Sequence, residues 1–129
     1  MKTKSIVLFL IFILLAAIKM EAKNVLPGGE EEYLPMAEVM PEPVDGMAGI
    51  VKKITYPAIA KSAGMEGRVI AMAFINENGG VDDVKIIKGL GGGCNEEVEK
   101  VLRTSKFKPG INEGKPVKVK LTMSFVFKK

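Results

Sequence analysis

The chain of 129 residues contains no histidine and a single cysteine, Cys94. Without histidine, imidazole general bases, Ser-His and Cys-His nucleophile pairs and the usual zinc ligand sets are excluded. One cysteine cannot form an internal disulfide, so packing and hydrogen bonds must hold the fold. These absences argue against an enzyme and against a metal or other cofactor.

The N-terminus lacks an apolar run of the usual membrane-spanning length. The run from Ile6 to Ile18 has thirteen residues, whereas a spanning helix needs about 20. Because Lys2 and Lys4 precede this run, residues 1–22 are interpreted as a signal peptide for export. Met20-Glu21-Ala22 is a poor cleavage pattern, so an uncleaved signal anchor stays open, and only a retained leader predicts membrane contact.

The remaining composition is that of one ordinary globular domain, with 47% hydrophobic and 26% charged residues. Residues 1–22 hold three lysines and one glutamate, so their removal lowers the formal net charge from +4 to +2. The sequence has no clustered basic stripe, so nucleic-acid binding is not expected. Residues 23–46 are rich in proline, glycine and glutamate, which predicts an extended lead-in arm with a short strand around Tyr33 to Val39. Residues 47–129 form the expected domain.

The first part of this domain predicts a bent helix. Ile50, Val51 and Ile54 share one side from Met47 onward, and Tyr56 separates this piece from a second one at 57–63, because the residue before a proline avoids the α conformation. Together they form one amphipathic element.

Two strands and a second helix follow. Residues 68–75 are apolar on both faces, Asn78-Gly79 is a hairpin turn, and residues 81–88 alternate. After a glycine-rich connection, a helix is expected at about 95–105, with Asn95 as its N-cap. Its expected buried stripe is Cys94, Val98, Val101 and Leu102.

The chain ends in a regular strand from Val117 to Phe127, in which apolar and polar residues alternate. The order helix, strand, strand, helix, strand predicts an α+β fold in which two helices cover one face of a three-stranded antiparallel sheet.

Three local features resemble ligand or catalytic sites but are interpreted as structural. The glycines at 89–93 precede a helix but lack phosphate-loop spacing, and Glu96 and Glu97 would repel a phosphate there. Asp82 and Asp83 are adjacent on a strand, so they point to opposite faces and cannot share a substrate. Cys94 is expected to be a buried apolar residue.

The last strand leaves two interpretations equally open. A terminal strand at a sheet edge can pair with another strand, in a partner or in a second copy of the chain. Its lysines can equally protect the edge from such pairing.

In this order and spacing, a series of short motifs resembles the TonB C-terminal domain family over about residues 40–127. The motifs are Met40-Pro41-Glu42, Tyr56-Pro57 with Ala60, Gly64, Gly67, Val69, Phe74, Asn78-Gly79, Val84, Cys94-Asn95, Phe107-Lys108-Pro109-Gly110 and Gly114-Lys115-Pro116-Val117.

The resemblance implies a periplasmic domain that binds the N-terminal box of outer-membrane receptors by strand addition, as part of TonB-dependent transport. It favours docking on the final strand. The implied partner-binding residues are Tyr56, Pro57, Val117, Lys118, Val119, Lys120, Leu121, Thr122, Met123, Ser124 and Phe125.

The sequence also departs from the family's full-length energy transducers, which have a histidine-bearing membrane helix and a long proline-rich spacer. A cleaved leader would leave no mechanical link to the inner membrane. The alternative function is therefore a secreted inhibitor or adaptor module that binds another periplasmic protein without transmitting energy.

Overall fold

The computed structural model describes residues 32–129. The expected leader and most of the expected acidic run at 30–32 lie outside the described residues. Within residues 32–129, no helix is long and apolar enough to cross a membrane.

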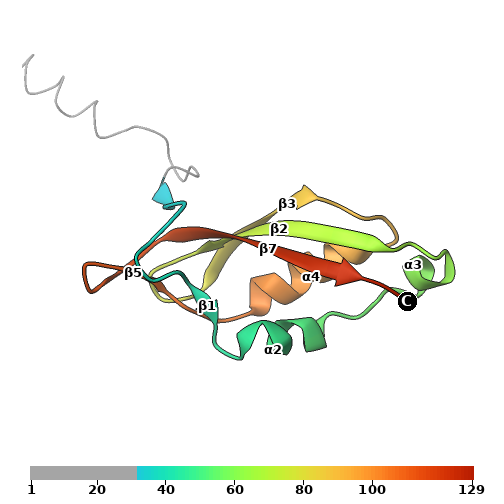
Figure 1. The fold of residues 1–129 in the computed structure, drawn as a ribbon, viewed down its shortest axis with the longest axis horizontal. Helices are drawn as coiled ribbons and strands as arrows, with labels where there is room; N and C mark the ends of the chain where they lie inside the picture. Colours follow the sequence, from blue (N-terminus) through green and yellow to red (C-terminus); the bar gives the residue numbers. More distant parts are fainter. Residues whose placement is uncertain (1–31) are drawn as a thin grey trace, which may run out of the picture. The chain divides into compact units, whose positions relative to one another are not determined.

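The domain is a three-stranded antiparallel sheet with helices packed on it (Figure 1). In chain order the elements are β1 (Glu42–Pro43), α2 (Gly46–Lys53), α3 (Ala58–Ser62), β2 (Gly67–Ile75), β3 (Val81–Lys88), α4 (Cys94–Thr104), β4 (Phe107–Lys108), β5 (Gly110–Asn112), β6 (Lys115–Val117) and β7 (Val119–Phe127). The strand order is β3-β2-β7. Two small pairs, β1 with β4 and β5 with β6, accompany this sheet. The predicted α+β architecture is confirmed.

The core lies between one face of the sheet and the helices. α4 packs on β2 and β3, and α2 contacts α4. The buried cluster joins alternate residues of β2 to Ile50 of α2 and to the predicted stripe of α4. All four residues of that stripe, Cys94, Val98, Val101 and Leu102, are buried as predicted.

The β2–β3 turn is fixed by contact with β4. Gly79 has a φ of +83°, and its carbonyl accepts a hydrogen bond from the Phe107 amide at 2.9 Å. A Cβ at Gly79 would lie 1.8 Å from the Phe107 carbonyl oxygen. The predicted Asn78-Gly79 turn is therefore confirmed, and a close backbone approach adds to the need for glycine there.

The helical predictions need three corrections. Gly93, not Asn95, is the N-cap of α4, and the Asn95 side chain instead accepts a hydrogen bond from the Leu90 amide at 2.8 Å. Val51 is 54% exposed, so it does not belong to the buried side of α2. The second helical piece begins at Ala58, with Pro57 as its N-cap and not as its first residue. The predicted separation around Tyr56 is confirmed, because residues 54–57 between α2 and α3 are not helical.

The final strand is shorter than predicted. Val117 belongs to β6 and pairs with Gly110, while Lys118 lies between β6 and β7. The predicted alternation holds in β7, where Val119, Met123 and Phe125 are buried. The early break follows from the β5–β6 hairpin, whose tight turn at Glu113 and Gly114 takes positive φ at both residues.

Candidate functional site

The sheet has two edges, and they differ in regularity. β3 pairs with β2 with two register irregularities, between Ile70 and Ala71 and between Phe74 and Ile75. β7 pairs with β2 over nine consecutive residues without a shift. Because bulges and twists hinder strand pairing, the regular edge at β7 is the better surface for an added strand.

The outer backbone groups of β7 can be assigned from one contact. The Lys120 amide donates to the Leu34 carbonyl, so it points away from β2. Since backbone direction alternates in an unbroken strand, the amides and carbonyls of Thr122, Ser124 and Val126 also point away from β2. Within residues 32–129, no strand pairs with β7 on this side from Leu121 onward.

A groove of about 380 Å³ runs beside this open part of β7. Val51 and Ile54 form one wall together with Tyr56, and residues 124–128 form the other. The Tyr56 ring meets the Phe127 ring edge-on, with centroids 5.5 Å apart and planes at 76°. The groove is thus a partly apolar channel whose lining includes an aromatic contact.

Tyr56 is held in place by its hydroxyl as well as by its ring. The hydroxyl donates a hydrogen bond to the Met65 carbonyl. Desolvation raises the pKa of the Tyr56 phenol, and the nearby Glu66 carboxylate raises it further. The phenol therefore stays protonated at neutral pH and keeps this hydrogen bond.

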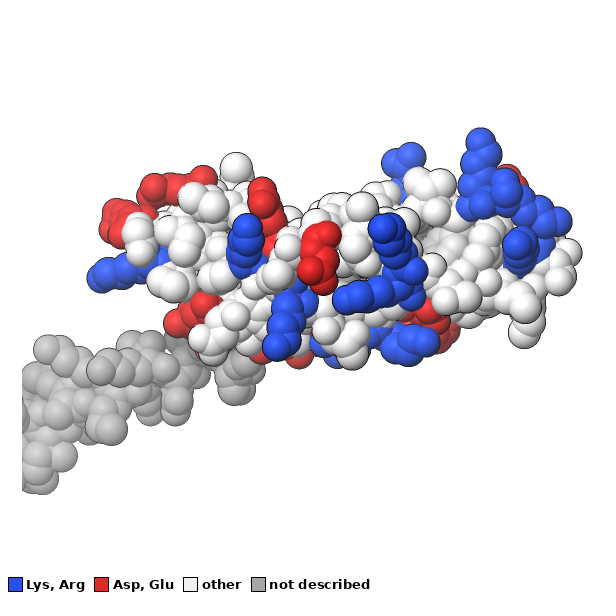
Figure 2. All heavy atoms as spheres, turned by 90° about the horizontal axis from the view of Figure 1, so that it is seen from below, with Lys and Arg blue, Asp and Glu red and all other residues white. Residues whose placement is uncertain are grey.

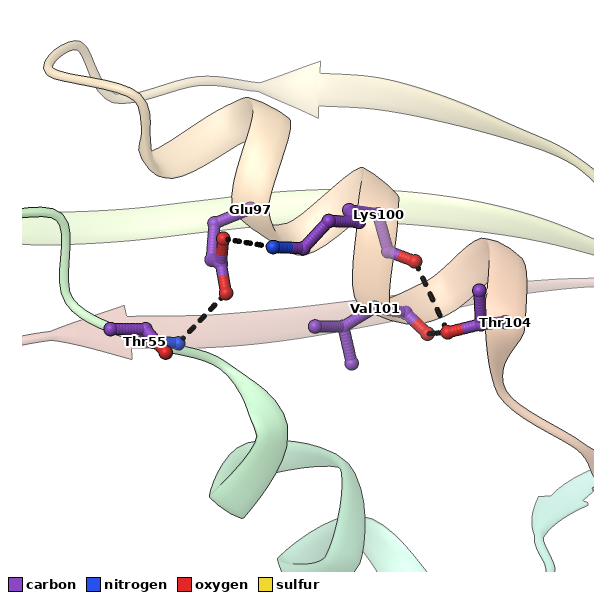
Figure 3. Close-up of polar contacts among 5 residues, drawn as sticks. All are labelled: Thr55, Glu97, Lys100, Val101 and Thr104. Carbon is purple, nitrogen blue, oxygen red and sulfur yellow. Dashed lines mark hydrogen bonds and ion pairs between the residues drawn. The ribbon is translucent and has the colours of Figure 1, made fainter.

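Glu97 of α4 holds the segment that carries Tyr56 through a hydrogen bond to the neighbouring Thr55 (Figure 3). Its Oε1 accepts a hydrogen bond from the Thr55 amide at 3.1 Å, and its Oε2 pairs with Lys100 Nζ at 3.1 Å. The Thr55 hydrogen bond, followed by that from Lys100, holds the pKa of Glu97 below its usual range. Figure 3 shows the carboxylate between the loop and the helix. Sequence reasoning missed this role, because it considered Glu97 only as a negative charge at the start of the helix.

The structure separates the residues predicted to bind a partner. Tyr56 lines the groove, whereas Pro57 lies near Gly93 at the start of α4. Val117 pairs within the β5–β6 hairpin, and the outer backbone groups of Lys118 and Lys120 contact Leu34.

Within β7, odd and even positions have different roles. Val119, Leu121, Met123 and Phe125 turn their backbone groups toward β2. Thr122 and Ser124 carry open outer groups. Sequence reasoning missed Val126 because the implied site ended at Phe125. It missed Val51 and Ile54 as parts of the groove wall because it placed them only on the apolar side of the first helical piece.

Charges around the site are mixed in sign. Figure 2 shows lysine and arginine side chains in separate groups over one face, with aspartate and glutamate among them. Next to β7, Lys118 Nζ pairs with Glu32 at 3.2 Å, and this carboxylate raises the pKa of Lys118. Within residues 32–129, no group of three or more acidic, histidine or cysteine side chains could hold a metal ion.

An open, regular edge strand beside a groove has the geometry to accept an added strand. Residues 52–128 match the sequence profile of the family described as Gram-negative bacterial TonB protein C-terminal. The chain belongs to the TonB C-terminal family. This assignment confirms the resemblance carried by the sequence motifs.

The chain is also similar to one TonB protein. The chain is 31% identical over 74 residues to Protein TonB of Pseudomonas aeruginosa, covering 57% of this chain and 22% of that protein. The chain thus matches about a fifth of that relative's length.

Two solved TonB domains are also similar in structure. The solution NMR structure of the Helicobacter pylori TonB C-terminal domain aligns with a TM-score of 0.50 at 24% identity, covering 63% of this chain and 86% of that one. This likeness supports the fold. The solution NMR structure of the P. aeruginosa TonB C-terminal domain aligns with a TM-score of 0.48 at 30% identity, covering 58% of this chain and 77% of that one.

Proposed function

We propose that this TonB C-terminal domain is a periplasmic protein-binding module without catalytic activity. It docks an extended segment of an outer-membrane receptor by strand addition and so takes part in TonB-dependent transport. Membership of the TonB C-terminal family supports the receptor as partner.

The observation that carries this proposal is the open outer edge of β7. Three residues, Thr122, Ser124 and Val126, direct amide and carbonyl groups away from β2. Unpaired backbone groups in a row are a template for a further strand. The regular register of β7 against β2 keeps these groups in line.

The groove supplies the second part of the recognition. A strand paired with β7 presents alternate side chains to opposite faces. One set faces the groove wall formed by Val51, Ile54 and Tyr56, and the other lies beside the exposed Thr122 and Ser124 side chains. Backbone bonds supply affinity with modest side-chain selectivity, which is consistent with a Kd of about 1 μM, or roughly −8 kcal/mol.

A titration of the isotope-labelled domain with a receptor N-terminal box peptide tests the proposal. We expect the amide signals of Thr122, Ser124 and Val126 to shift most, with smaller shifts in the groove wall. If a saturating amount of peptide leaves these signals unmoved, the proposed function is wrong.

A pair of substitutions at one position separates backbone pairing from side-chain contact. In Ser124→Pro, the outer amide is lost while the amides that face β2 remain, which is the position where an edge strand tolerates proline. We expect its Kd to rise at least about tenfold, given the lost hydrogen bond and the altered strand.

The matched control is Ser124→Val, which keeps the outer amide and suits a strand. We expect its Kd to stay within about twofold of wild type. Binding that survives Ser124→Pro but is lost on substitution within the Gly89–Gly93 connection would assign the function to that loop, as the alternative inhibitor or adaptor role requires.

A further inference from the structure

The lead-in arm occupies the first part of the β7 edge. The Leu34 amide donates to the Lys118 carbonyl at 2.8 Å, and the Leu34 carbonyl accepts from the Lys120 amide at 3.0 Å. Leu34 thus forms an isolated parallel bridge with Val119. An incoming strand cannot use these two outer groups of β7 while Leu34 is in place.

The side chains of the two residues before Leu34 anchor the arm on the sheet. The Tyr33 ring meets the Phe74 ring of β2 edge-on, with centroids 5.1 Å apart, and its hydroxyl donates to Asp82 of β3. Glu32 pairs with Lys118, whose Nζ lies 5.6 Å from the Tyr33 ring centroid. The arm is therefore attached to all three strands of the sheet.

The phenol keeps this attachment over a wide pH range. Burial and the Asp82 carboxylate raise the pKa of Tyr33 to about 12. The hydrogen bonds from Tyr33 and then Asn76 hold the pKa of Asp82 below its usual range. At neutral pH the phenol is a donor and the carboxylate an acceptor, as the contact requires.

The arm leaves the edge directly after this bridge. The next backbone contact is with β5, where Val39 and Ile111 exchange two hydrogen bonds of 3.0 and 2.9 Å. The Lys120 carbonyl is then the first backbone group beyond the arm that points away from β2. The amide and carbonyl groups of Thr122, Ser124 and Val126 follow it along β7. The edge that remains open extends from Leu121 to Phe127.

We propose that Tyr33 and Leu34 form a fixed stop on the β7 edge, which sets the length and register of the strand that the domain accepts. This inference rests on the proposed function, since it concerns the same docked segment. The accepted segment pairs along Leu121 to Phe127, and residues beyond the stop add no backbone hydrogen bonds to β7. At about 3.3 Å per residue, this edge matches a short extended peptide rather than a long one.

Peptides of two lengths test the stop. The short peptide contains only the segment that pairs with Leu121 to Phe127, and two long peptides extend it by four residues at either the N- or the C-terminus. Testing both extensions covers parallel and antiparallel docking. The three peptides are titrated into the full chain of wild type, Leu34→Pro and Leu34→Val.

Leu34→Pro removes the amide that bonds to the Lys118 carbonyl, whereas Leu34→Val keeps it. In wild type and Leu34→Val we expect all three peptides to bind within about twofold of one another. In Leu34→Pro we expect one long peptide to bind on the order of three- to tenfold more tightly than the short one, because one or two additional backbone bonds become available.

Amide hydrogen exchange gives a reading that does not depend on the peptide. In the free wild-type chain, the Lys120 amide is expected to exchange slowly and the Thr122 amide quickly. In Leu34→Pro, both should exchange quickly. Quick Lys120 exchange in the free wild-type chain overturns the stop. Equal affinity of Leu34→Pro for all three peptides, with its Lys120 amide exchanging quickly, overturns it as well.

Displacement of the arm by a peptide would also overturn the proposed stop. If a long peptide binds wild type more tightly than the short one while the Tyr33 ring signals move to unstructured positions, the arm yields to the peptide and is no stop. In either case the short peptide still binds, so the proposed function stands. If the short peptide does not bind wild type at all, the proposed function fails and the stop fails with it.

Discussion

Gly79 is the position where backbone conformation and packing restrict the sequence most. Its φ of +83° disfavours any side chain, and a Cβ would lie 1.8 Å from the Phe107 carbonyl oxygen. The same contact fixes the β2–β3 turn against β4, so the turn and the chain after α4 depend on each other.

We expect Gly79→Ala to lower the free energy of unfolding by at least about 2 kcal/mol, because backbone strain and the clash with Phe107 add together. Gly114→Ala is the matched control, since Gly114 has a similar φ of +75° with nothing within 4 Å of the added Cβ. It should cost only about 1 kcal/mol. Equal losses for both variants in urea unfolding would show that the Phe107 contact contributes nothing.

Glu97 is a positioning residue for the groove, and it gives a pH-dependent prediction. Its folded-state pKa is lowered, so its contribution to stability is present above the usual glutamate pKa of about 4.3 and is lost as pH falls through the folded value. We expect Glu97→Ala to cost about 0.5–1.5 kcal/mol at pH 7, as for a typical hydrogen bond, and less below pH 4.3.

Glu97→Gln is the control, because its amide oxygen can still accept the Thr55 hydrogen bond while its charge is gone. It should keep peptide affinity closer to wild type than Glu97→Ala does. Urea unfolding between pH 3 and pH 8 measures the stability effect. A stability difference between wild type and Glu97→Ala that grows as pH falls would contradict this role.

At the scale of elements, β7 combines two environments in one strand. Its odd-numbered residues face β2 with their backbone and the core with their side chains, and its even-numbered residues face away. Amide exchange should therefore alternate along β7. We expect Met123 and Phe125 to exchange slowly and Thr122, Ser124 and Val126 to exchange quickly, as measured by NMR in the free chain. Uniformly slow exchange would mean that the outer edge is already covered.

The elements with strong periodicity could be predicted from the sequence alone. The pattern of residues 81–88 gave β3 with its correct bounds, and the apolar stripe from Cys94 to Leu102 gave the buried side of α4. Local periodicity suffices there, because each pattern reports directly which face is buried.

What could not be predicted depends on contacts between distant segments. Alternation continues from Val117 into β7, so nothing local marks the change of partner at Lys118. The pairing of Leu34 with Lys118 and Lys120 joins residues more than 80 positions apart. The exposed position of Val51 likewise depends on where α4 and β7 lie, which its own helix pattern does not contain.

At the scale of the whole molecule, the two edges of the sheet are used differently. The β3 edge carries irregular pairing and the ion pair of Asp83 with Arg103 at 3.1 Å, while the β7 edge is regular and borders the groove. The arm then covers only the first part of β7. Under the proposed function, an added strand would therefore pair with the open part of β7.

Binding at that place should stabilise the entire domain, because the β7 edge exists only in the folded chain. With peptide at about 100 times its Kd, mass action adds roughly 2.7 kcal/mol to the free energy of unfolding. For a domain of this size, each kcal/mol raises Tm by about 4–8 °C, so we expect an increase of about 10 °C or more.

The Ser124 pair shows whether this stabilisation comes from edge pairing. Thermal unfolding with and without peptide should give the full increase in Ser124→Val. At the same peptide concentration it should give about half of that increase or less in Ser124→Pro, because a tenfold higher Kd leaves roughly 1.4 kcal/mol of stabilisation. Each variant is compared with its own peptide-free Tm, so any intrinsic stability change caused by the substitution cancels. An equal increase in both variants would mean that the peptide stabilises the domain from a surface other than the outer backbone of β7.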